Sequence, residues 1–174
     1  MKLFSINSEK RKRAQRAEAW ARSILDQSVE PVPYEKGWIP DEFDKRLEWA
    51  SLHGACLVAR LSSEGSSLAD HATPLTEALL YLYDYAHRET GVGDASIARK
   101  MRKHGEHLIG LTVALGDALV QPDREAAVTD VILRNGIGME VGPISSYLLS
   151  VYSALSQQTD SELLEGKTIL WPEF

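Results

Sequence analysis

A single cysteine, Cys56, occurs among the 174 residues, and no apolar run approaches the roughly 20 residues that a membrane-spanning helix needs. One cysteine cannot close a disulfide within the chain, which suits a reducing compartment. The composition, 44% hydrophobic and 25% charged, is that of a soluble globular protein. The length fits one domain that can bury a substantial core.

Strand patterns are also missing, because no segment sustains the alternation of apolar and polar residues that a half-buried strand needs. No internal repeat is found either. Apolar residues recur instead at spacings of three and four, which predicts an all-α, single-domain bundle of about six helices. The expected helices cover residues 8–26, 41–61, 73–89, 97–118, 122–135 and 143–155. An extended connector rich in proline and aromatic residues, 29–40, follows the first helix, and the rings of Tyr34 and Trp38 are expected to pack on the body.

Charge is unevenly distributed along the chain. Residues 1–22 carry seven Lys or Arg and two Glu, a net +5, and the remainder carries twelve against twenty-three, a net −11. We therefore divide the chain into a basic N-terminal arm and helix (1–28), a helical domain (29–158) and a C-terminal tail that packs back (159–174). The basic cluster in residues 10–22 indicates contact with an anionic membrane surface or ribosomal RNA, and a solvated helix face is the plainer alternative. Nothing in the sequence indicates DNA binding.

A helix-helix corner is expected between the third and fourth helices. Gly91 is placed to cap the third helix in the left-handed conformation, and Asp94, after Gly93, is placed to cap the fourth. Val92 is expected to fold back onto the helix. Glu89 continues the inner stripe of the third helix, so we expect it to face inward, where it would need a cation or donors.

Three cations are expected to project outward around this corner, namely Arg88, Arg99 and Lys100. Beside a rigid turn they would offer directional donors to a partner. Each could instead serve its own helix, for example Arg88 through an ion pair with Asp84 four residues earlier. We predict a partner-binding surface here and no catalytic group, because no nucleophile and base can be paired from the sequence.

Two pairs with helical spacing are the candidate ligands for a metal or haem: His53 with Cys56, and His104 with His107. Nothing in the sequence brings the pairs together. A hydrogen-bonded core histidine explains His104 equally simply, because it lies in an apolar stripe. We therefore expect no cofactor and no metal.

An extended set of residues carries a family resemblance. The set comprises Tyr34 to Asp41, Phe43-Asp44-Lys45-Arg46, Leu52-His53, Arg60-Leu61, Arg88-Glu89, Gly91-Val92-Gly93-Asp94, Ile97, Lys100-Met101, Gly110 and Arg134-Asn135. With these residues the chain resembles the ubiquinol-cytochrome c chaperone family over roughly residues 15–140. Two positions depart from the family pattern, with Leu111 where arginine is usual and His87 where leucine is more frequent. These departures are typical of a divergent bacterial member.

The resemblance implies a non-catalytic assembly chaperone that binds cytochrome b, or another subunit of the cytochrome bc complex, while complex III is assembled. It also implies a small helical partner protein, and it adds Arg134 and Asn135 to the partner-binding candidates. An apolar groove for client helices is expected beside the third and fourth helices. The expected location is the cytoplasm, peripheral to the inner membrane, or the mitochondrial matrix in a eukaryote. A helical haem- or metal-binding protein and a ribosome- or RNA-binding adaptor are the alternatives.

Overall fold

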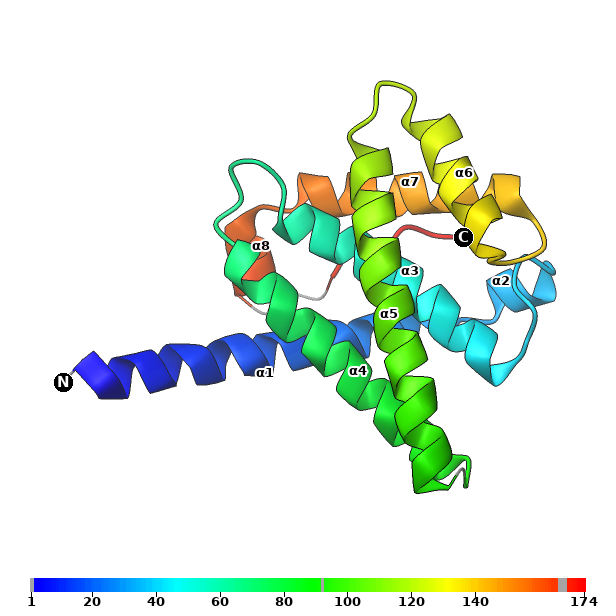
Figure 1. Ribbon diagram of the computed structural model, residues 1–174. Coiled ribbons are helices and arrows are strands. Elements are labelled where there is room, and N and C mark those ends of the chain that lie inside the picture. Colours follow the sequence, from blue (N-terminus) through cyan, green and yellow to red (C-terminus); the bar gives the residue numbers. More distant parts are fainter. Residues whose placement is uncertain (1, 92, 166–168) are drawn as a thin grey trace.

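Helix α3, Phe43–Leu61, runs through the middle of the molecule and is covered by other elements along most of its length (Figure 1). The computed structural model describes the backbone of residues 2–91, 93–165 and 169–174, and the side chains of all of these except 2–6, 94 and 95. Helices α1, α4, α5 and α7 all pack against α3. Helix α3 is therefore the central helix of the bundle.

The prediction of an all-α fold is confirmed, and the described ranges contain no strand. The helices are α1 (Lys2–Ser28), α2 (Val32–Glu35), α3 (Phe43–Leu61), α4 (Ala72–Glu89), α5 (Asp94–Leu119), α6 (Arg124–Asn135), α7 (Val141–Gln157) and α8 (Asp160–Leu164), with a 3₁₀ turn at Ala69–His71 before α4. The six long helices correspond to the six expected ones. None of the helices in the described part of the chain has both the length and the apolar character needed to cross a membrane.

Close approach to α3 is possible because small residues lie on its surface. A Cβ atom added at Gly54 would lie 2.7 Å from Cδ1 of Leu79 on α4. The absence of a side chain at Gly54 therefore lets α4 pack directly on the backbone of α3. Trp49, on the same helix, is fully buried and fills the space toward Tyr147 of α7, at 5.5 Å between ring centroids.

Local signals define the ends of α6. The carboxylate of Asp123 accepts a hydrogen bond from the Ala126 backbone N–H at 3.2 Å, as an N-cap residue does. At the other end, Gly136 adopts φ +59° in the left-handed region and ends the helix. The end predicted at Asn135-Gly136 is therefore confirmed.

The connector after α1 differs from the expectation, because it is not extended throughout. Val32–Glu35 form a single helical turn, α2, after Pro31 at the N-cap position. Proline fixes φ near the helical value and lacks the N–H that the first turn leaves unpaired, so Pro31 and Pro33 favour a short helix. The aromatic rings are half-buried: Tyr34 packs under the Arg46 guanidinium and Trp38 against Phe174.

Both ends of the chain contact the helical body. The second half of α1 buries Ala17, Trp20, Ala21 and Ile24, whereas its first half extends beyond the other helices (Figure 1). In the tail, Ile169 is buried, Trp171 donates from Nε1 to Ser23 Oγ at 3.0 Å, and the Phe174 ring stacks on Tyr147 at 4.5 Å. The division of the chain at residues 28 and 158 stays a prediction.

Arg60, near the end of α3, is buried and ties three elements together. Its guanidinium donates to the Leu155 and Gln158 carbonyls at 3.1 and 2.8 Å and to the Asp160 carboxylate at 2.8 Å. Hydrogen bonds from Ser67, and then from Arg60, lower the pKa of Asp160 to about 2. The network therefore holds the end of α7 and the start of α8 against α3.

Replacing Arg60 with methionine should lower the free energy of unfolding by about 3 kcal/mol, because it leaves one carboxylate oxygen of Asp160 and two carbonyls without their donor. Urea denaturation followed by circular dichroism measures the change. The matched control is Arg22→Ala, which removes an exposed ion pair with Glu18 and should change the stability little. Equal losses in the two variants would contradict this role for Arg60.

Candidate functional site

The corner between α4 and α5 is built around Gly91. Helix α4 ends at Glu89, and Gly91 has φ +75°, so the predicted left-handed residue is confirmed. The Gly91 N–H donates to the Arg88 carbonyl at 3.1 Å. Helix α5 begins at Asp94, with Gly93 (φ −69°) as its N-cap residue, which places Asp94 inside the helix and not at the cap. The expectation for Val92 and the role of the Asp94 side chain lie outside the described part of the chain.

The prediction that Glu89 faces inward is wrong. Glu89 is exposed, and the buried polar residue at this end of α4 is His87. The reason is that side chains of α3 and α5 lie beside His87 at the last turn of α4. The ring of His87 packs against Phe43 of α3 at 4.9 Å and against His104 of α5 at 5.0 Å between centroids. These neighbours lie on a side of α4 that the Leu75–Leu79–Leu82 stripe does not mark.

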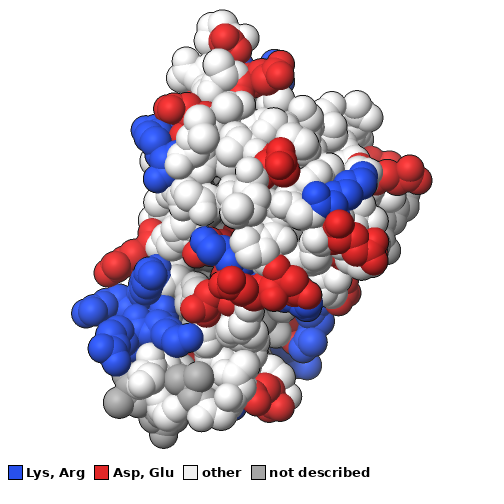
Figure 2. All heavy atoms as spheres, turned by 90° about the vertical axis from the view of Figure 1, so that its right-hand side faces the viewer, with Lys and Arg blue, Asp and Glu red and all other residues white. Residues whose placement is uncertain are grey.

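Basic side chains gather near this corner. Arg99, Arg102 and Lys103 are exposed on the first turns of α5, and Figure 2 shows a cluster of Lys and Arg low on one face of the molecule. Lys100 is half-buried, with its Nζ 3.6 Å from Asp44 Oδ1 on α3. We call Arg99, Arg102 and Lys103, with Lys100, the basic patch.

Arg88 is exposed but is engaged on its own helix. Its Nε and Nη2 donate to the two carboxylate oxygens of Asp84 at 2.7 and 3.2 Å. These hydrogen bonds lower the pKa of Asp84. The ion pair between Arg88 and Asp84, which the sequence indicates as the alternative role of Arg88, is therefore present.

Arg134 and Asn135 lie on α6, away from the corner. Arg134 pairs with Asp130 at 3.0 Å, and Asn135 donates from Nδ2 to the Val131 carbonyl at 2.8 Å. Arg134 faces the second half of α5, around Val113, whereas Arg99 and Lys100 lie on its first turns. Fourteen residues of helix separate Arg99 from Val113, roughly 20 Å. The five partner-binding candidates therefore do not form one continuous surface.

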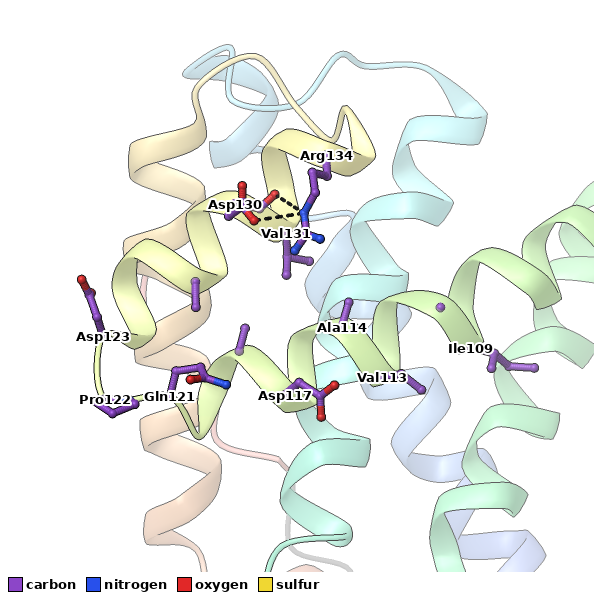
Figure 3. Close-up of a pocket in the computed structure, with 13 residues that line it drawn as sticks. Ile109, Val113, Ala114, Asp117, Gln121, Pro122, Asp123, Asp130, Val131 and Arg134 are labelled. Carbon is purple, nitrogen blue, oxygen red and sulfur yellow. Dashed lines mark hydrogen bonds and ion pairs between the residues drawn. The ribbon is translucent and has the colours of Figure 1, made fainter.

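A groove runs between α5 and α6 and encloses about 980 Å³ (Figure 3). Ile109 and Val113 form one edge and are 57% and 60% exposed, so the groove is open to solvent. A Cβ atom added at Gly110 would have no other atom within 4 Å, so there is open space in front of this glycine on α5. The lining residues are Ile109, Gly110, Val113, Ala114, Asp117, Ala118, Gln121, Pro122, Asp123, Ala127, Asp130, Val131 and Arg134.

The rim of this α5–α6 groove is acidic. Asp117, Asp123 and Asp130 supply three carboxylates against one guanidinium, that of Arg134, so the lining carries a net charge of −2. Apolar side chains form the surface between them. Such a groove suits an apolar helix with basic residues at its ends.

The sequence predicts an apolar groove beside α4 and α5, whereas this groove lies between α5 and α6. A signal for it was present, because Ile109 and Val113 are four residues apart on the side of α5 away from the buried Leu108, Leu111 and Leu115. Periodicity identifies the inner stripe of a helix but does not show which outward apolar residues have a neighbouring helix beside them.

The candidate ligands on α3 are occupied by internal hydrogen bonds. His53 Nδ1 lies 2.9 Å from the Trp49 carbonyl oxygen, and Nε2 lies 3.1 Å from Tyr147 Oη. Burial lowers the pKa of His53 to about 4 and raises the pKa of the Cys56 thiol to about 12. Both groups are therefore neutral core residues, and neither joins a cluster of metal-binding side chains in the described residues.

His104 does have a second histidine nearby, but it is not the one that helical spacing suggested. Its Nε2 lies 2.9 Å from Nε2 of His87. Together with Asp44 these two histidines form the group of three candidate ligands found in the described residues, and His107 is not part of it. Sequence spacing missed His87 and Asp44 because they come from two other helices.

Comparison with known proteins gives two matches to this architecture. The family described as ubiquinol-cytochrome C chaperone matches residues 35–171, a span that contains the corner and the groove. The crystal structure of the Cbp3 homolog from Brucella abortus is similar, with a TM-score of 0.78 and 22% sequence identity over 99% of this chain and 97% of that one. At this identity, the likeness shows a shared fold. No curated protein matches the chain.

The two corner glycines should respond differently to alanine. Gly91→Ala should lower the free energy of unfolding by about 1 kcal/mol, because an L side chain is strained at φ +75°. Gly93→Ala should change it by no more than about 0.5 kcal/mol, since φ is −69° and nothing lies within 4 Å of the added Cβ. Thermal and urea denaturation provide the comparison, and equal effects would show that the corner does not require a left-handed residue.

Proposed function

Because the chain belongs to the ubiquinol-cytochrome c chaperone family, we propose that it is a non-catalytic chaperone for assembly of the cytochrome bc complex, and that its client is cytochrome b. The observation that carries this proposal is the open α5–α6 groove with its apolar surface and acidic rim. A membrane subunit that waits for its partners must keep apolar helix surface out of water. A groove of this shape covers one face of such a helix without any chemical step.

The charge of the rim supports a membrane-protein client. Loops on the cytoplasmic side of membrane proteins carry an excess of Lys and Arg. Asp117, Asp123 and Asp130 stand where the flanks of a bound helix would lie, so basic loop residues would meet carboxylates. The apolar surface then provides affinity, and the rim provides orientation.

The basic patch at the other end of α5 suits a second, acidic partner. Arg99, Arg102 and Lys103 are exposed on adjacent turns of one rigid helix, so their spacing is fixed. A small helical partner protein or the ribosome surface would present the opposite charge. Since the groove uses the second half of α5, the two partners could be bound at the same time.

The first half of α1 favours an anionic surface as a third contact. Lys10 and Arg11 are exposed on a helix that extends from the body, while Arg13 is held by Asp70 at 3.0 Å. We propose that this segment holds the chaperone at the periphery of the inner membrane. Lipid headgroups attract such clusters over about a Debye length, so the attraction should weaken with added salt.

Filling the groove should remove client capture while the fold is kept. Gly110→Leu adds a side chain on the open α5 wall and should reduce co-purification of cytochrome b from solubilised membranes by about tenfold or more. The same change should raise the free energy of unfolding slightly, because leucine favours a helix by about 0.8 kcal/mol over glycine. The readout is haem absorbance and mass spectrometry of the captured material.

The matched control for this test is Gly116→Leu. Gly116 lies on the same helix with open space around it but does not line the groove. Its variant should capture cytochrome b as the unmodified chain does. Equal capture by the Gly110 and Gly116 variants would show that the groove is not the client site, and normal complex III in a deletion strain would contradict the proposed function.

Charge reversal in the basic patch tests the second surface. The double variant Arg99→Glu with Lys100→Glu should weaken capture of the second, acidic partner by about tenfold, because two attractive contacts become repulsive. The change of stability should be small, since the ion pair that Lys100 makes with Asp44 is largely open to solvent. The exchange variant Arg99→Lys with Lys100→Arg keeps the charge and should keep capture. If the glutamate variant captures as much as the unmodified chain, these residues are not part of the binding surface.

A further inference from the structure

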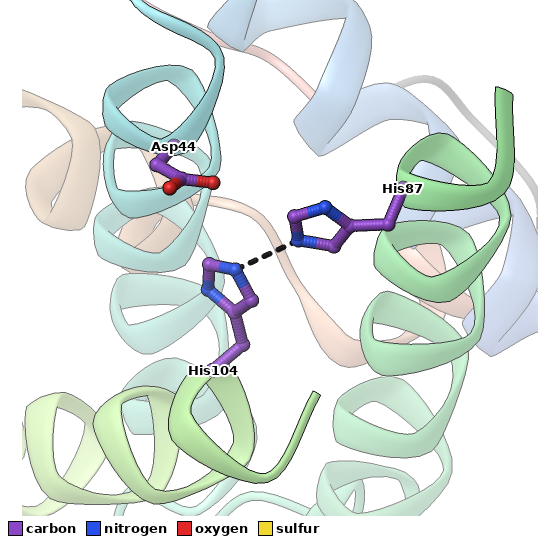
Figure 4. Close-up of side chains that lie close together, drawn as sticks. All are labelled: Asp44, His87 and His104. Atoms are coloured by element: carbon purple, nitrogen blue, oxygen red, sulfur yellow. Dashed lines mark hydrogen bonds between the residues drawn. The ribbon is translucent and has the colours of Figure 1, made fainter. Parts of the chain in front are cut away.

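We propose that Asp44, His87 and His104 form a binding site for one divalent transition-metal ion of the zinc class, which joins α3, α4 and α5 at the corner. The nitrogen and oxygen atoms that these residues offer all lie within 4.8 Å of one another. Each comes from a different helix, and Figure 4 shows the three side chains converging. This site is separate from the groove and does not depend on the proposed client.

The histidine pair already has nearly the spacing that an ion requires. The two Nε2 atoms are 2.9 Å apart. Zinc holds imidazole nitrogens at about 2.0–2.1 Å in tetrahedral geometry, which places two nitrogens roughly 3.3 Å from each other. A separation of the rings by a few tenths of an ångström is therefore enough to admit the ion. The His87 ring is buried and the His104 ring is half-buried, which favours the neutral imidazole that acts as a ligand.

Asp44 can supply the third ligand because it lies in the exposed first turn of α3. Its carboxylate now faces Lys100, with 3.6 Å between Oδ1 and Nζ. This exposed pair is weak and can be exchanged for a bond to the ion by a rotation of the side chain. Two nitrogens and one carboxylate oxygen leave a fourth position for water, as in open zinc sites.

The surroundings of His87 also point to a ligand. Its side chain is fully buried beside the Phe43 ring, and its Nδ1 has no hydrogen-bond partner among the described residues. A buried polar atom without a partner is costly, and an apolar side chain would fill this position without that cost. A bond from Nε2 to an ion would leave Nδ1 as it is, but it would explain why a histidine occupies this costly position.

A bound ion would change the corner in two ways. It would link the end of α4 to the start of α3 and to α5, and so fix the angle that Gly91 allows. It would also take Asp44 away from Lys100, so that the charge of this basic-patch residue is no longer offset by that carboxylate. Metal binding and the charge of the partner surface would therefore be coupled.

Titration of the full chain with Co²⁺, followed by competition with Zn²⁺, tests the site directly. We expect one ion per chain, visible bands of low-symmetry Co²⁺, and loss of those bands when Zn²⁺ is added. His87→Gln and His104→Gln should each weaken binding by about 100-fold or more, since even the loss of outer hydrogen-bond partners of a metal site costs 10–100-fold. His107→Gln is the matched control, because His107 is one turn from His104 but outside the group, and it should bind as the unmodified chain does.

A second measurement covers the risk that the buried histidine variants fold poorly. Asp44→Asn changes an exposed side chain and should keep the fold, yet it should weaken Co²⁺ binding by about tenfold or more. Zn²⁺ at 100 times its dissociation constant should raise the melting temperature of the unmodified chain by on the order of 5–10 °C, and less for Asp44→Asn. The absence of Co²⁺ bands, or equal affinity in the His87 and His107 variants, would show a neutral hydrogen-bonded histidine pair and overturn the proposal. None of these readouts involves cytochrome b, so the result is independent of the proposed function.

Discussion

Burial of α3 on almost every side is the constraint on which the rest of the structure depends. A helix in that position must find partners inside the protein for each polar side chain that it carries. His53 is satisfied by Trp49 and Tyr147, and Arg60 by the end of α7 and by Asp160. These bonds fix α7 and α8 against the centre. The C-terminal tail is held at the same place, because Phe174 stacks on the same Tyr147 that His53 contacts.

The same arrangement explains why a groove stays open at the edge of the molecule. Helices α1, α4, α5 and α7 cover α3, and α6 packs on α5 and α7 outside this layer. The outer side of α5 is therefore covered only in part, and Ile109 and Val113 face the groove. An assembly chaperone needs a rigid, apolar surface of this kind, which a client can bind and later leave. One helix, α5, presents this groove at one end and the basic patch and histidine cluster at the other.

Most residues whose role depends on local backbone geometry were predicted well, although Gly93 and not Asp94 is the N-cap residue of α5, and the connector 29–40 contains a helical turn. Gly91 and Gly136 end their helices in the left-handed conformation. The sequence indicates such an end because a glycine directly after an amphipathic run can adopt this conformation without strain. The all-α class follows from periodicity for a similar reason. Residues whose role depends on a distant neighbour were predicted poorly. Glu89 was expected inside and is exposed, and His87 is buried, because Phe43 and His104 lie beside the last turn of α4.

The sequence by itself determined the helices, most of their ends, the uneven charge and the family resemblance, because each depends on residues close together in the chain or on their order. Tertiary structure alone decided which helix faces meet. It paired His104 with His87 and Asp44 instead of His107, and it placed Arg134 at the groove, roughly 20 Å along α5 from Arg99. The physical reason is that a contact between helices depends on the rotation and crossing of both, and neither is encoded in the periodicity of one helix.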